Sequence, residues 1–364
     1  MMTVCSTEKC TGCGACAVAC PLGCIGMRPS AEGFLYPEVE AERCVECGRC
    51  QSVCPSNTPM PLAKPQEVCA GWCEDSQIRR SSSSGGSFYA LAADTIKRGG
   101  TVFGAILCND MTVRHKAART LSGIGPMMGS KYAQSELGES YDQALEFLAR
   151  GREVLFTGTP CQIAGLRTLV TDDLKGNLFL VDIVCHGVPS VKFFRRYMEW
   201  LREGHPDIDP GSFRFRTLEE WNAVPNAELS GVRTPLRGRD SIYTKLFLKG
   251  YLHRESCYRC PYARPERAGD ITIADFWGIG EAGRFDHDTT EGCSLAMVNT
   301  PAGAEKFRRT EGFYAESRPL SEAINGNAQL RAPVPRPPQR SGIYDYIFSH
   351  TQDEVQENYL SKKR

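Results

Sequence analysis

Eight cysteines near the start of the chain form two copies of one metal-binding spacing. The first copy comprises Cys10, Cys13, Cys16 and Cys20, and the second comprises Cys44, Cys47, Cys50 and Cys54. Each copy reads C-x2-C-x2-C-x3-C and is followed by proline. With this doubled spacing, the fourth cysteine of each copy binds the cluster held by the other copy. We therefore predict one [4Fe–4S] cluster on Cys10, Cys13, Cys16 and Cys54, and a second on Cys44, Cys47, Cys50 and Cys20.

The residue types in this segment suit iron–sulfur chemistry. Soft thiolates bind iron, and three closely spaced thiolates can surround one corner of a cubane. Gly12, Gly14 and Gly48 allow backbone N–H groups to approach the sulfides. Two complete motifs of the bacterial ferredoxin type argue against the alternative, a zinc knuckle. Cys5 and Cys24 lie outside the motif, and we interpret them as ordinary small core residues.

Four more cysteines stand where another metal site can form. They are Cys161, Cys185, Cys257 and Cys260. Cys161 follows a predicted strand that ends at Thr157, and Cys185 stands at the end of the predicted strand that begins at Leu178. Sites form at the carboxyl ends of parallel strands, so both thiols are expected to face one crevice. The last two form a C-x2-C pair before Pro261, and the four thiolates together would hold a third [4Fe–4S] cluster.

Alternatives for this second set stay open, because spacing does not show whether distant residues converge. A structural zinc site and buried free thiols also fit the pattern. Core packing is the better interpretation of the remaining cysteines, which are Cys69, Cys73, Cys108 and Cys293.

Two loops carry groups that could bind a phosphate. Residues 81–87 are all Ser or Gly and precede a predicted helix, so Ser84, Gly85, Gly86 and Ser87 could hold a phosphate at its N-terminus. A flexible turn is the simpler alternative. Gly158 and Thr159 precede another predicted helix and could act in the same way.

Two kinds of titratable residue complete the candidates. His186 follows Cys185 directly and could donate a proton near a redox centre, which makes it the candidate catalytic residue, although a lone His is more often structural. Asp270 and Asp275 flank a predicted buried strand, where a capping or turn role is the alternative.

These residues must be positioned by an alternation of strands and helices. Strands are predicted over residues 68–72, 101–108, 154–156, 178–185, 271–274 and 294–298, and helices over 88–98, 141–150, 191–203 and 343–360. Ser190 is the expected N-cap of the third helix, which should end at Gly204. The alternation predicts an α/β domain with a mainly parallel or mixed sheet, behind an α+β ferredoxin-like domain.

Proline-rich and other loop-forming segments predict where the chain divides into domains. We expect a two-cluster ferredoxin domain over residues 1–61, the N-terminal part of the core over 66–205 and its C-terminal part over 206–331. A Pro-rich tether and a peripheral helix are expected over 332–364. A segment from about Glu67 to Thr300 is expected to fold without the ferredoxin domain.

Composition narrows the functional classes. The 364 residues contain 43 basic and 43 acidic side chains, so the zero net charge does not indicate nucleic acid or an anionic membrane as a partner. The sequence shows neither a signal peptide nor an apolar run long enough to span a membrane. Eighteen cysteines without a signal peptide indicate metal sites rather than disulfides, and the cytoplasm is the expected compartment.

Several segments in combination resemble the coenzyme F420 hydrogenase/dehydrogenase beta-subunit family, in a form with a two-cluster ferredoxin domain in front. The segments are Ser82 to Gly86, Ser130-Lys131-Tyr132, Gly158 to Gln162, Cys185 to Ser190, Cys257-x2-Cys260 and Gly269 to Gly278. The resemblance implies an FAD-containing iron–sulfur oxidoreductase with a [4Fe–4S] cluster on the four core cysteines. It also implies flavin contacts from the Ser/Gly loop, Lys131 and Gly158-Thr159. Asp275, in the last of these segments, is a further candidate cofactor-binding residue.

The resemblance implies a route in which single electrons pass through the clusters to FAD, which exchanges a hydride with an organic molecule of the coenzyme F420 type. A flavin belongs between the two, because it handles both one and two electrons. The expected partners are a redox protein and a small hydride acceptor or donor. Two alternatives are a non-enzymatic ferredoxin-like relay and an assembly protein that has lost its flavin.

Overall fold

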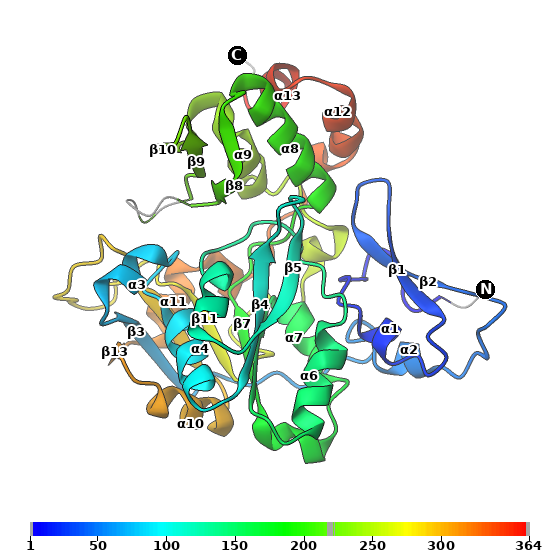
Figure 1. Cartoon of the computed structure of the whole chain (residues 1–364), viewed down its shortest axis with the longest axis vertical. Helices are drawn as coiled ribbons and strands as arrows, with labels where there is room; N and C mark the ends of the chain where they lie inside the picture. Colours follow the sequence, from blue (N-terminus) through cyan, green and yellow to red (C-terminus); the bar gives the residue numbers. More distant parts are fainter. Residues whose placement is uncertain (1–2, 217–220, 222, 362–364) are drawn as a thin grey trace.

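The computed structural model describes residues 3–216, 221 and 223–361. Figure 1 shows three regions: the cysteine-rich N-terminal region, a large sheet with helices on both faces, and a smaller layer that contains α8, α9 and the C-terminal helices. The predicted fold class is confirmed, since a ferredoxin-like region precedes a mixed sheet with parallel strands.

The N-terminal region is built on two short helices, each of which begins in the middle of a cysteine motif. They are α1 (Ala15–Val18) and α2 (Arg49–Ser52), and they lie beside the antiparallel hairpin of β1 (Ile25–Pro29) and β2 (Leu35–Val39). Gly14 and Gly48 cap the two helices with φ of 73° and 75°. A side chain would be strained in this left-handed conformation, so glycine is required where the chain turns from one cysteine into the helix that carries the next.

The large sheet has eight strands in the order β13-β3-β12-β11-β7-β6-β4-β5. Their bounds are β3 (Glu67–Cys73), β4 (Thr101–Leu107), β5 (Val113–Ala118), β6 (Val154–Gly158), β7 (Leu178–Ile183), β11 (Ile271–Asp275), β12 (Ser294–Val298) and β13 (Phe313–Ser317). The central strands β4, β6, β7 and β11 run parallel, and the outer pairs are antiparallel. All six predicted strands are present.

Alternation along the central strands builds a core on each face of this sheet. Leu155, Phe179 and Val181 pack on one face with α4 (Ser87–Lys97). Phe156 and Leu180, one residue along, pack on the other face with α6 (Ser140–Ala149) and α7 (Pro160–Arg167). Burial on both faces explains why these strands are almost continuously apolar in sequence.

Further elements complete the sheet and its helical cover. They are α3 (Ser76–Ser81), α5 (Leu121–Ile124), α10 (Pro301–Arg309) and α11 (Leu320–Gly326). Strand β13 pairs with β3 at the edge of the large sheet. The expected independent segment, which ends at Thr300, would lack this strand, so that boundary is too early.

The third region contains a small sheet of order β10-β9-β8 and four helices. Its elements are α8 (Val191–Gly204), β8 (Ile208–Arg214), β9 (Asn226–Leu229), β10 (Val232–Pro235), α9 (Ile242–Leu248), α12 (Ile343–Ser349) and α13 (Gln352–Tyr359). Helix α8 begins and ends as predicted, because the Ser190 hydroxyl accepts from the Phe193 N–H and the helix ends at Gly204.

The C-terminal helices are not peripheral. Two helices stand where one was predicted, and Ile343, Tyr344 and Ile347 are buried in one core with Phe193 and Tyr243. The end of the chain therefore completes the third region. Within the described residues, no helix is both long and apolar enough to cross a membrane.

Candidate electron-transfer site

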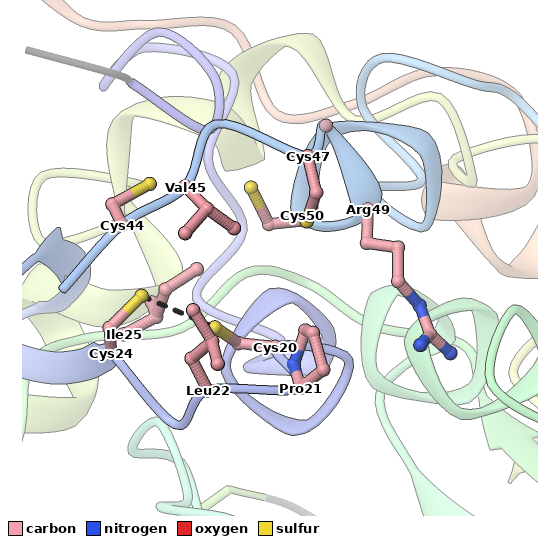
Figure 2. A pocket seen from close by; sticks show the side chains of 11 residues that line it. Cys20, Pro21, Leu22, Cys24, Ile25, Cys44, Val45, Cys47, Arg49 and Cys50 are labelled. Carbon is pink, nitrogen blue, oxygen red and sulfur yellow. Dashed lines mark hydrogen bonds between the residues drawn. The ribbon is translucent and has the colours of Figure 1, made fainter.

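The first pocket of the N-terminal region, called here the outer pocket, brings Cys20 of the first motif to three cysteines of the second motif. It is lined by Cys20, Cys44, Cys47 and Cys50, and also by Cys24. Figure 2 shows this pocket with Leu22 and Val45 among its lining side chains. Cys47 is exposed, as are these two apolar residues, so the outer pocket lies at the protein surface.

The second pocket, called here the inner pocket, has the reciprocal composition. It is lined by Cys10, Cys13, Cys16 and Cys54, together with Cys5. All four motif thiols are at most 8% exposed, in contrast to the outer pocket. The two pockets therefore group the cysteines in the crossed arrangement that was predicted from spacing.

Cys13 and Cys16 of the inner pocket are unfavourable as free thiolates, whereas a hydrogen bond from Cys5 lowers the pKa of Cys54 to about 6. Burial raises the pKa of Cys13 to about 12 and also raises the pKa of Cys16. Thiolates in such a place need positive charge beside them, and bound iron supplies it. Cys10 differs, because a hydrogen bond from Cys5, assisted by the charge of Arg254, lowers its pKa to about 6.

Among the described residues, no three His, Cys, Asp or Glu side chains converge closely enough to hold one metal ion. A four-iron cluster does not require such convergence, because each thiolate binds a different iron.

The four core cysteines come from three segments of the chain and lie close enough together for their charges to interact; this group of cysteines is called here the core crevice. Cys161 lies in the first turn of α7, directly after β6, and Cys185 lies two residues past the end of β7. Cys257 lies in the 3-10 helix η4 (Glu255–Arg259), and Cys260 follows it. Burial, and then the charges of Cys257, Cys161 and Cys260, raise the pKa of Cys185. The prediction that Cys161 and Cys185 share a crevice agrees with this proximity.

Helix α7 lies beside both the inner pocket and the core cysteines. A Cβ atom at Gly165 of α7 would lie only 3.0 Å from the Cβ and 3.1 Å from the Sγ of Cys13. The pKa of Tyr262 is raised by burial and by the nearby charges of Cys161 and Cys13. Gly165 stands four residues after Cys161 and on the same face of α7, so Cys13 of the inner pocket lies beside the core cysteines along that face.

The Ser/Gly loop lies against two strand ends of the large sheet. The Ser84 hydroxyl donates to Cys293 O at 2.8 Å and approaches Ala274 O at 3.5 Å. A Cβ at Gly85 would lie 2.2 Å from Gly71 O, and Gly86 caps α4 with φ of 91°, so both glycines are structurally required before Ser87 begins the helix.

A second segment packs against this loop. The Ser130 N–H donates to the Ser83 hydroxyl at 2.6 Å. The next residue, Lys131, donates from Nζ to Pro126 O and Met128 O, and burial lowers its pKa to about 7. Both of these acceptors are neutral carbonyl oxygens, so Lys131 Nζ has no anionic partner among the atoms that it contacts in the described residues.

Further candidates have partners within the protein. Thr159 forms a capping box with Gln162 at the start of α7, beside Gly158. Asp275, at the end of β11, accepts from Arg216 and from Trp221 Nε1, each at 2.6 Å.

The candidate catalytic residue His186 is also engaged. Its Nε2 lies 3.3 Å from Leu248 O, and its ring packs on Phe247 and His253. Burial lowers its pKa.

Two buried polar atoms, one near the Ser/Gly loop and one near Gly158, have no partner among the described residues, and this supports a bound group. They are Ser294 Oγ, 3.0 Å from the Cβ position of Gly85, and Nδ1 of His115, whose Nε2 contacts Thr157 O. Together with hydroxyls and N–H groups at the start of α4, these atoms suit the phosphates and polar edge of a dinucleotide.

Sequence reasoning missed three participants in the cysteine sites. Cys5 and Cys24 are core residues, as expected, but each also lines a pocket; the Cys24 Sγ lies 3.4 Å from the Cys20 Sγ. Arg254 donates to both the backbone and the sulfur of Cys10. Only the proximity of Arg254 to Cys257 in sequence could have drawn attention to it.

Replacing Cys54 by alanine should damage the cluster of Cys10, Cys13 and Cys16, although Cys54 lies in the other motif. The reason is that Cys54 lines the inner pocket. Electron paramagnetic resonance of the reduced protein distinguishes the two clusters, and Cys20→Ala is the matched control that should damage the other one. Loss confined to the Cys44/Cys47/Cys50 cluster in the Cys54 variant would show that the ligation is not crossed.

Comparisons with known proteins find matches to two parts of the chain. Residues 151–322 match the family described as the C terminus of the coenzyme F420 hydrogenase/dehydrogenase beta subunit, and residues 9–58 match the 4Fe-4S dicluster domain. The chain is similar to a chain of the F420-reducing [NiFe] hydrogenase complex from Methanosarcina barkeri, with 17% identity and a TM-score of 0.51 over 82% of this chain and 93% of that chain. At this identity the likeness shows a shared fold. None of the curated proteins compared with the chain matches it.

Proposed function

Because residues 151–322 match the coenzyme F420 hydrogenase/dehydrogenase beta-subunit family and residues 9–58 match a 4Fe-4S dicluster domain, we propose that this chain is an oxidoreductase of that family, which links one-electron transfer to hydride exchange. The two N-terminal clusters, a third cluster on the core cysteines and one FAD are the proposed cofactors. The proposed hydride partner is a deazaflavin of the coenzyme F420 type.

The contact between Cys13 and α7 is the observation that carries this proposal. Cys13 of the inner pocket packs against Gly165, one turn along the helix from Cys161. A buried, close contact of this kind fixes the separation of two redox centres and excludes water between them. It supports direct passage of electrons from the ferredoxin region into the core.

Exposure supports an order of centres. Cys47 of the outer pocket is exposed, whereas the thiols of the inner pocket are buried behind it. A partner protein can approach the outer pocket, so we propose that electrons are exchanged there and pass through the inner pocket to the core. Leu22 and Val45 give the surface at the outer pocket an apolar centre suited to a transient redox partner. The similar chain belongs to a hydrogenase complex, and we propose a multi-subunit assembly here too.

The Ser/Gly loop and its neighbours support the flavin assignment. The phosphates would lie at the start of α4, where they would be held by Ser84, Gly85, Gly86 and Ser87. Lys131 Nζ would be a further contact for the flavin. Gly158 and Thr159 lie at the start of α7, and Thr159 also contacts the Cys161 Sγ at 3.2 Å. These residues would therefore place the flavin beside the core cysteines. When bound, the flavin accepts electrons singly and exchanges them in pairs as hydride.

His186 and Asp275 have more limited proposed roles at the same end of the sheet. His186 would donate or hold a proton beside the core crevice, through a ring fixed by Phe247 and His253. Asp275 would orient Arg216, whose guanidinium it binds, rather than contact the flavin directly.

Cofactor analysis of the anaerobically purified full chain tests this function. About twelve iron atoms and twelve acid-labile sulfides are expected per chain from three four-iron clusters, with one FAD. Reduction of coenzyme F420 by the protein with a chemical one-electron donor is the activity test. About eight iron atoms with zinc in addition would contradict a core cluster, and a folded protein without flavin would contradict hydride exchange.

A further inference from the structure

Arg254 is a completely buried cation that joins the core to the ferredoxin region. It stands one residue before η4, which carries Cys257, and its side chain reaches across to the first cysteine motif. Its Nε donates to Cys10 O at 2.6 Å, and Nη2 donates to Leu35 O at 2.9 Å. Nη2 also lies 3.4 Å from the Cys10 Sγ.

The other faces of this guanidinium are covered by neutral groups. Nη1 donates to the Gln134 side-chain oxygen at 3.1 Å, and the guanidinium carbon lies 4.1 Å from the Tyr36 ring centroid and 5.5 Å from that of Phe34. Within the part of the chain that the structure describes, no carboxylate lies within ion-pair distance of Arg254.

Comparable buried cations in this chain have carboxylate partners. Arg267 pairs with Asp182 at 3.1 Å, Lys306 pairs with Asp94 at 2.6 Å, and Arg340 pairs with Glu32. A buried charge without a counter-charge is costly, so Arg254 needs negative charge nearby. Among the described residues that accept a hydrogen bond from it, Cys10 is the one whose side chain can ionise.

We propose that Arg254 is the counter-charge of the inner-pocket cluster and raises its reduction potential. The proposal rests on the dicluster assignment within the proposed function. Reduction adds one electron and no proton to the cluster. A guanidinium beside a ligand sulfur, in a buried place of low dielectric constant, stabilises the added negative charge. The resulting bias draws an electron from the exposed outer cluster toward the core.

The absence of a side chain at Gly12 leaves space for the Arg254 guanidinium. Its φ is +70°, and a Cβ there would lie 2.8 Å from Arg254 Nη1 and 2.9 Å from Gln134 Nε2. Glycine at this position therefore permits the guanidinium to approach the cysteine motif, and Gly12→Ala should displace it without removing its charge.

Redox titration of the full chain, followed by electron paramagnetic resonance, tests the proposal. Arg254→Gln should lower the equilibrium constant for reduction of the inner cluster at least tenfold, which is about 59 mV for one electron. Arg254→Lys should give a smaller shift in the same direction, because the positive charge remains but the planar guanidinium with its several N–H donors is lost. The inner cluster is identified as the one that Cys54→Ala damages.

Arg28→Gln is the matched control, because Arg28 is an exposed arginine of the same region, paired with Glu38. It should leave both potentials unchanged. An unchanged inner potential in Arg254→Gln, with iron content retained, would overturn the proposal, as would equal shifts of both clusters. If Arg254→Gln does not fold, Arg254→Lys and Gly12→Ala decide by the same measurement. Flavin content does not enter the result, so failure of the hydride-transfer function is distinguishable from failure here.

Discussion

Replacement of Cys185 by alanine is expected to remove about four of the twelve iron atoms per chain and to stop flavin reduction by one-electron protein donors. Cys185 lies at the carboxyl end of β7 and, with Cys161, Cys257 and Cys260, makes up the core crevice. On the proposed function, loss of this cysteine leaves electrons in the inner pocket without a core centre to pass to. Direct hydride exchange between deazaflavin and FAD should continue, because it does not use the cluster.

Iron and sulfide analysis with anaerobic stopped-flow spectroscopy measures both effects. Cys108→Ala is the matched control: Cys108 follows β4 and is a half-buried cysteine outside the two pockets and the core set. It should retain all clusters and the full rate of flavin reduction. Twelve iron atoms and an unchanged rate in Cys185→Ala would exclude Cys185 as a ligand of an electron-transfer centre.

The N-terminal motifs could be predicted from sequence because their ligands are local. Within each motif, only two or three residues separate one cysteine from the next, so spacing alone restricts the geometry. The crossed grouping of Cys20 and Cys54 follows from the same repeat. Cys5 and Cys24 could not be predicted as pocket residues, because they have no fixed offset from the motif.

The core cysteines differ from the N-terminal motifs, because they are distant from one another in sequence. The candidate ligands extend from Cys161 to Cys260, and the order of strands in the sheet brings them together. The strand ends could be predicted, since β6 and β7 are apolar runs buried on both faces. The approach of η4 to those ends depends on tertiary packing, so the spacing indicated the four cysteines but left a zinc site and free thiols as alternatives, and the family resemblance favoured a cluster.

The elements missed by pattern are those with weak periodicity. Strands β9 and β10 have four residues each, β8 contains Pro210 and Gly211, and β13 is half-exposed at the edge of its sheet. The C-terminal segment was misjudged for a different reason. Its prolines suggested a tether, but polar and aromatic side chains beyond them, notably Arg340 and Tyr344, are buried against both the core and the ferredoxin hairpin.

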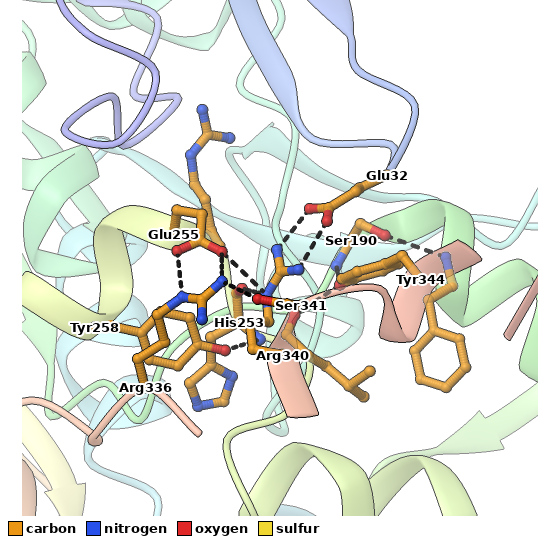
Figure 3. A network of polar contacts seen from close by, with 12 residues as sticks. Glu32, Ser190, His253, Glu255, Tyr258, Arg336, Arg340, Ser341 and Tyr344 are labelled. Atoms are coloured by element: carbon orange, nitrogen blue, oxygen red, sulfur yellow. Dashed lines mark hydrogen bonds and ion pairs between the residues drawn. The ribbon is translucent and has the colours of Figure 1, made fainter. Parts of the chain in front are cut away.

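Arg340→Ala should destabilise the attachment of the ferredoxin hairpin by about 2 to 3 kcal/mol, because it leaves Glu32 without its partner. Figure 3 shows the two side chains facing each other, with Nη1–Oε1 and Nη2–Oε2 distances of 2.7 and 2.5 Å. Arg340 also donates from Nε to His253 O at 2.8 Å. The Arg340 side chain is 2% exposed and that of Glu32 is 34% exposed, so the cost falls below that of a fully buried pair.

Hydrogen exchange measures this effect locally, since amides of β1 and β2 should exchange faster when the hairpin opens from the core. Glu32→Gln should have a similar effect, and the double variant should cost less than the sum because both changes break one interaction. Arg336→Ala is the control: its pair with Glu255 lies in the same network but is about one-third exposed, so it should cost less than about 1 kcal/mol. Equal exchange rates in the Arg336 and Arg340 variants would mean that the C-terminal segment does not hold the ferredoxin hairpin, and the separation of the inner pocket from the core would then depend on the α7 contact and Arg254 alone.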